Sequence, residues 1–170
     1  MKLTMLLWPA AAGVGLATLL AFLPLGGGPS SAQDTCLVYS STDIPKDIPA
    51  INGTVTSTLT VTDSFTLTDV NVGPLNITHT WVADLQVHLN SPDNVRVELF
   101  TNVGDDRDDF VGTVLDDAAA ESIGNTAVAS APFTGTFSPE GMLSTFVGGA
   151  SAGSWQLEIR IPNVPAKWGR

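Results

Sequence analysis

The sequence has little cysteine, little histidine and little positive charge. Its single cysteine, Cys36, has no second thiol to pair with, so the fold must hold without an internal disulfide. Seven basic residues stand against 17 acidic ones, which gives a formal charge of −10. Nucleic-acid binding depends on clustered Lys and Arg side chains, and here these are scattered. That class of function is therefore excluded.

The residues that carry catalysis are scarce as well. A serine protease needs a base within hydrogen-bond reach of its nucleophile. Only His79 and His88 are present, both inside strand-like patterns, and no serine lies in a Gly-x-Ser-x-Gly elbow. Zinc sites draw on His and Cys residues, which are too few here. We expect that the chain is not an enzyme; the rival expectation is an enzyme with an unrecognised acidic site.

The first 32 residues have the composition of an export leader. A short basic start precedes an apolar run from Leu3 to Leu25, and small residues follow up to Ala32. This pattern predicts a signal peptide over 1–32 that is removed. The mature protein would then be secreted or extracytoplasmic, with no stable membrane insertion. The apolar run is also long enough to span a bilayer, so an uncleaved anchor is the alternative.

The rest of the chain reads as short strands. Residues 33–53 are polar, contain Pro45 and Pro49, and predict an extended lead-in. From Thr54 onward, apolar and polar residues alternate with a period of two, which is typical of half-buried strands. The alternation predicts strands over 54–62, 65–72, 77–82, 85–89, 95–100, 111–115 and 155–161.

Turn signals separate these strands. Ser91–Asn94 predicts a tight reversal, and the stretch 118–123 after two aspartates predicts one helical turn. Many short strands without a long helical period predict an all-β fold, a jelly-roll β-sandwich over 54–161. An irregular tail is expected over 162–170.

Acidic residues gather in loop-like places. Four aspartates lie within 105–109, Asp116 and Asp117 follow, and Asp84 stands between two apolar segments. Calcium takes six to eight oxygen ligands, largely from carboxylates and backbone carbonyls. The spacing is not that of an EF-hand, because Arg107 occupies a ligand position. The alternative to a calcium site is a solvated acidic loop.

Seven segments, in this order along the chain, are similar to one known family. They are Ser41–Pro49, Leu75–Leu85, Leu89–Pro92, Leu115–Ala119, Ala131–Gly135, Pro139–Gly141 and Gly153–Leu157. Together they resemble the P domain, also called the P/Homo B domain. That domain follows the catalytic domain in kexin- and furin-like convertases and in many bacterial subtilisin-like serine proteases. The likeness spans about residues 41–159.

The resemblance implies a jelly-roll sandwich that packs against a subtilisin-like protease domain and stabilises it. In some bacterial members the domain also binds calcium, and Asp84, Asp116 and Asp117 are the candidate ligands by position. No protease domain precedes the resemblance in this sequence. We therefore expect a secreted, non-catalytic P-domain protein, tied to proteolysis by family only. The alternative is a stand-alone extracellular binding module for surface glycan or protein.

The C-terminal end departs from the family, whose members finish with a strand that bears a tryptophan. Pro162 and Pro165 make the tail of this chain a poor central strand, because proline cannot donate to a ladder. We expect that the last strand is missing or altered. The strand Trp155–Ile161 should then have an unprotected edge, which would leave the domain marginally stable alone.

Overall fold

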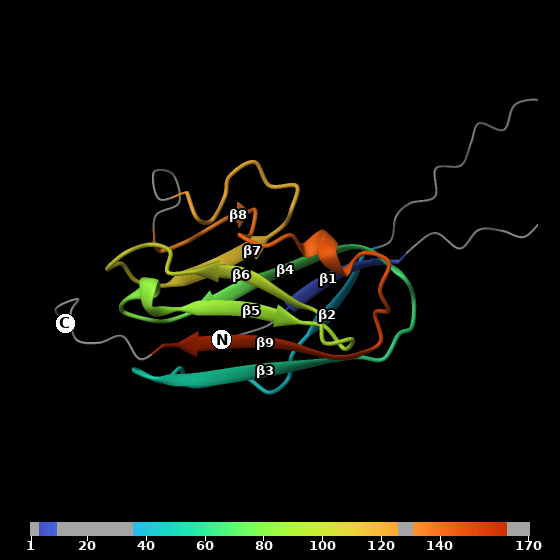
Figure 1. The fold of residues 1–170 in the computed structure, drawn as a ribbon, viewed down its shortest axis with the longest axis horizontal. Helices are drawn as coiled ribbons and strands as arrows, with labels where there is room; N and C mark the ends of the chain where they lie inside the picture. Colours follow the sequence, from blue (N-terminus) through green and yellow to red (C-terminus); the bar gives the residue numbers. More distant parts are fainter. Residues whose placement is uncertain (1–3, 10–35, 126–130, 163–170) are drawn as a thin grey trace, which may run out of the picture.

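Two β-sheets face each other and enclose one hydrophobic core (Figure 1). A computed structural model describes residues 4–9, 36–125 and 131–162. Within these ranges the chain is built of strands, with two short 3-10 helices, η1 (Val82–Asp84) and η2 (Leu143–Phe146). Neither helix is long and apolar enough to cross a membrane. The prediction of an all-β sandwich is confirmed.

The first sheet contains five strands in the order β2-β1-β4-β7-β8. Their bounds are β1 (Thr4–Pro9), β2 (Leu37–Ser40), β4 (Leu67–Ile77), β7 (Phe110–Leu115) and β8 (Thr136–Phe137). Neighbours are antiparallel, except that β7 and β8 run parallel. This sheet takes β1 from the segment predicted as a leader and β2 from the predicted lead-in. The sandwich therefore includes residues outside 54–161, while 10–35 and 163–170 lie outside the described residues.

The second sheet contains four strands in the order β3-β9-β5-β6. Their bounds are β3 (Gly53–Val61), β5 (Gln86–Asn90), β6 (Arg96–Thr101) and β9 (Gly153–Ile161). β9 pairs along its whole length with β3, from Gly53 opposite Ile161 to Val61 opposite Gly153, and also with β5. The expectation that Trp155–Ile161 has an unprotected edge was wrong, because β9 lies between two partners.

The core follows the alternation read from the sequence. On β3, Ser57, Leu59 and Val61 are buried, as the period of two predicts. Between the sheets, the rings of Phe100, Phe110 and Phe133 stack with centroids 4.5 and 4.7 Å apart. Such offset aromatic contacts stabilise a core beyond the area that they bury. The sandwich thus has a dense aromatic centre without any disulfide.

The strand β4 covers most of the predicted strand 65–72 and continues to Ile77. The predicted strand over 77–82 was wrong, because the chain leaves the sheet after Ile77 and enters a loop that leads to η1. The ladder with β7 shifts register between Val72 and Leu75, which marks a bulge at Gly73 and Pro74. Gly73 has φ of +141°, and a Cβ there would lie 2.5 Å from the carbonyl oxygen of Thr113. Only glycine fits this close approach of two backbones.

Two local predictions meet different outcomes. The reversal at Ser91–Asn94 is confirmed, since Asn94 N–H donates to the Ser91 carbonyl at 3.0 Å. The helical turn over 118–123 was wrong. The chain makes a tight turn after Asp116, and Ile123 N–H donates instead to the carbonyl of Ser138 on a neighbouring segment. Alanine is the strongest helix former, but tertiary packing overrides helix propensity, and here Ile123 is buried in the core.

Candidate functional site

Asp84 ends η1 at one end of the sandwich. The backbone of this helix is fixed by the acidic loop, because Val82 N–H donates to the Arg107 carbonyl and Ala83 N–H to the Asp105 carbonyl. Asp84 lines an open hollow of about 260 Å³ together with Ala50, His79, Thr80 and Trp81. The acidic loop contributes backbone carbonyls here, while its side chains at 105–108 are exposed.

Asp116 and Asp117 lie just after β7 and hold local structure. Asp116 accepts the Ala118 N–H at 2.8 Å, which closes an Asx turn. Both carboxylate oxygens of Asp117 accept backbone N–H groups at the start of η2, from Leu143 and Ser144, each at 2.8 Å. These amides have no intrahelical partners, so a capping carboxylate stabilises them.

The three predicted ligands are not brought together. The acidic loop beside Asp84 precedes the first residue of β7, whereas Asp116 follows its last residue. The five steps from Phe110 to Leu115 separate the two ends of β7 by roughly 17 Å, at about 3.4 Å per step. Among the residues that the structure describes, no group of three or more His, Cys, Asp or Glu side chains is placed to hold a metal ion. Calcium binding stays a prediction, and one ion can use Asp84 or the Asp116–Asp117 pair, not both.

A third carboxylate, Asp69 on β4, faces the Asp116–Asp117 pair. Burial raises the pKa of Asp69, and the charges of Asp116 and Asp117 raise it further, against a lowering by the backbone N–H of Val70. Asn71 lies beside this group, with its side-chain amide 3.4 Å from Asp69 and 3.3 Å from Asp116. Sequence reasoning missed Asp69, because only the register of β4 against β7 brings it near Asp116.

The ring of His79 contacts the backbone of its own loop. Its Nδ1 atom lies 3.2 Å from the Trp81 N–H, which donates to it, and 2.9 Å from the Trp81 carbonyl. Asp109 accepts the backbone N–H of His79 at 2.9 Å rather than orienting its ring. The side chain therefore supports the loop, and His79 lies after the end of β4 rather than in the strand that its sequence pattern predicted.

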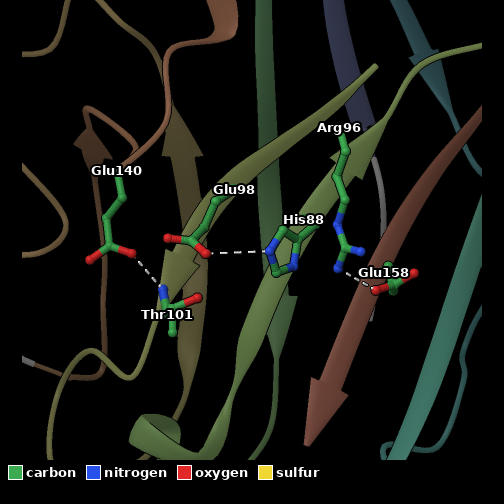
Figure 2. A network of polar contacts seen from close by, with 6 residues as sticks. All are labelled: His88, Arg96, Glu98, Thr101, Glu140 and Glu158. Atoms are coloured by element: carbon green, nitrogen blue, oxygen red, sulfur yellow. Dashed lines mark hydrogen bonds and ion pairs between the residues drawn. The ribbon is translucent and has the colours of Figure 1, made fainter. Parts of the chain in front are cut away.

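His88 lies in a row of charged residues on the outer face of the second sheet (Figure 2). Strand register puts Glu98 of β6 on one side of it and Glu158 of β9 on the other. The His88 Nε2 atom is 3.4 Å from a Glu98 oxygen, and Arg96 pairs with Glu158 at 2.7 Å. Glu140 accepts the Thr101 N–H at 2.7 Å, which ties the segment before η2 to β6.

Burial shifts the pKa values of two residues in this row, His88 and Glu140. Burial, and secondarily the charge of Arg96, lowers the pKa of His88, although Glu98 and Glu158 act in the opposite direction. The His88 Nδ1 atom is buried and has no hydrogen-bond partner. Burial also raises the pKa of Glu140. The sequence showed each of these residues on a predicted strand or loop, but not the strand order that makes them neighbours.

Comparison with known proteins agrees with the resemblance seen in the sequence. The family model described as the proprotein convertase P-domain matches residues 67–170. The match begins at the first residue of β4, so β1, β2 and β3 lie outside it. No curated protein and no solved structure matches the chain.

Proposed function

The chain belongs to the proprotein convertase P-domain family, because the family model covers more than half of it, and from this we propose its function. We propose that it is a secreted, non-catalytic accessory domain that binds a subtilisin-like serine protease domain and stabilises it. The family match carries this proposal, since P domains accompany such protease domains.

The surroundings of the two histidines support a non-catalytic role. Serine hydrolysis needs a histidine that takes a proton from a nucleophile within about 2.6–3.2 Å. The His79 ring contacts the backbone of Trp81, and the His88 ring contacts Glu98. Neither contact offers a hydroxyl or thiol nucleophile, which supports the proposal of a non-catalytic domain.

The alternative of a glycan-binding module finds less support. Such modules present exposed aromatic rings to sugar faces. Among the residues whose burial the structure describes, the aromatic side chains are buried or half-buried. The half-buried Tyr39 and Phe65 pack against the core, and the half-buried Trp81 is a single ring at the open hollow beside Asp84. The exposed large apolar residues are aliphatic: Val38, Ile51, Val111, Met142 and Val147. Met142 and Val147 flank η2, and the other three come from separate segments.

The test uses a bacterial subtilisin-like protease domain from which its own P domain has been deleted. Its half-life at elevated temperature is measured with and without the purified full chain, alongside turnover of a peptide panel. We expect a longer half-life, and no turnover by the chain alone. An unrelated β-sandwich of similar size and charge is the control.

Two results would contradict the proposal. One is a half-life that the chain leaves unchanged at concentrations up to 100 μM, across several such protease domains. The other is peptide turnover by the chain itself that survives further purification and is blocked by a serine-directed reagent.

A further inference from the structure

The strand β1 holds an interior position in the first sheet. It pairs antiparallel with β2 over four residues and with β4 over five (Figure 1). Met5 and Leu7 are fully buried in the core. The ladder with β4 shifts register at Pro9, which lacks the N–H needed to continue it. A segment of six residues thus joins two strands and fills part of the core.

The same six residues lie in the segment that the sequence predicts to be removed on export. Removal would leave β2 without the strand that ties it to the sheet, and β4 unpaired on one side. The gap would be one strand wide, with unpaired N–H and C=O groups on both walls.

The gap is difficult to close by movement of β2. Because β2 and β4 are both antiparallel to β1, they run parallel to each other. Direct pairing would require β2 to move by one strand spacing, about 4.8 Å, and to adopt the slanted parallel hydrogen-bond pattern. The walls are therefore shaped for an inserted antiparallel strand.

The side chains around the gap define what would fit. Met5 lies opposite Tyr39 and Val72, and Leu7 lies opposite Leu37 and Val70. An occupant needs apolar side chains at two positions separated by one residue, in an extended backbone. Main-chain hydrogen bonds to both walls would supply affinity, and the two buried positions would supply specificity.

We propose that the position between β2 and β4 is a strand-binding groove for another polypeptide. It accepts an extended segment with apolar residues at alternating positions, once cleavage has freed it of the chain's own N-terminal segment. In the intact chain, residues 4–9 occupy this groove in cis. The proposal does not depend on the protease partner, because its evidence is the position of β1.

The experiment begins with the full chain, folded with residues 4–9 in place. A recognition site for a sequence-specific protease is introduced between residues 10 and 35, the folded protein is cut there, and mass spectrometry verifies the cut. A fluorescent peptide of residues 3–10 is then added. We expect the cut protein to take up one peptide per chain, in exchange for its own fragment, as followed by fluorescence anisotropy.

Three controls isolate the groove. The uncut chain should not take up the peptide, because a tethered occupant has a high effective concentration. A peptide with Leu7→Asp should bind about a hundredfold more weakly or worse, because a buried carboxylate loses its hydration. A peptide with Leu7→Ile, which keeps the volume, should bind within about tenfold of the original.

Three outcomes would overturn the proposal. Failure to take up peptide under every condition in which the cut domain stays folded would mean that no groove persists. Equal binding of the Leu7→Asp peptide would mean adhesion to some other surface. Dimerisation of the cut protein with loss of the fragment and exclusion of the peptide would make a second copy the occupant.

Discussion

The substitution Leu7→Ala tests whether the N-terminal strand is part of the folded domain. Leu7 is fully buried in the interior of the first sheet. Truncation of a buried leucine removes its transfer free energy and leaves a cavity, which together lower the free energy of unfolding by about 2–5 kcal/mol. Typical domains have only about 5–15 kcal/mol in total, so the effect should be large.

Urea unfolding of the full chain, followed by tryptophan fluorescence, measures this change. With a urea slope of about 2 kcal/mol per molar, the midpoint should fall by roughly 1–2.5 M. The matched control is Val38→Ala on the adjacent strand β2, where Val38 is 62% exposed. Truncation of such a surface residue should change stability by less than about 0.5 kcal/mol. An equally small effect of Leu7→Ala would refute the assignment of β1 to the sheet.

Four further predictions concern other parts of the sandwich. The pKa of His88 is lowered in the folded state, so the native domain resists protonation of this ring, and the free energy of unfolding should fall as the pH drops below the ordinary value of 6.5. The variant His88→Gln should flatten this loss in unfolding curves taken between pH 7.5 and 5. Gly73→Ala should lower the free energy of unfolding by about 1–3 kcal/mol from backbone strain alone, and a wild-type unfolding midpoint in this variant would contradict the bulge geometry. Asp117→Ala should cost about 0.5–2 kcal/mol in the same assay, since two N–H groups of η2 lose their acceptor. Calcium should raise the melting temperature of the domain by mass action. The variants Asp84→Asn and Asp116→Asn, tested separately, should show which of these two carboxylates binds the ion. If a chelator leaves the wild-type melting curve unchanged, both carboxylates belong to a solvated acidic surface.

The sequence predicted the parts of the fold that depend on local patterns. Alternation of apolar residues located β3, β5, β6, β7 and β9 to within about two residues, because each strand has one face on the core. The turn at Ser91–Asn94 was predictable for a similar reason, since its proline and Asx residues favour that backbone.

The parts that depend on long-range pairing were not predictable in this way. β8 has two residues, too few for a period, and it is defined by its parallel pairing with β7. β1 reads as continuous apolar sequence, which cannot be distinguished from the start of a leader by pattern alone. Glu98 and Glu158 lie beside His88 because β5 is placed between β6 and β9, and the sequence does not show this strand order.

The ladder between β3 and β9 determines when the domain can form during synthesis. Its two strands lie roughly a hundred residues apart in the chain, so their pairing has a high contact order and a large loop-closure entropy. β9 also lies between β3 and β5 and pairs with both. The second sheet therefore stays open until the residues up to Ile161 have been made and have left the ribosome. Until then β3 has no strand to join it to β5, so the two earlier parts of this sheet, β3 and the β5–β6 pair, remain separate.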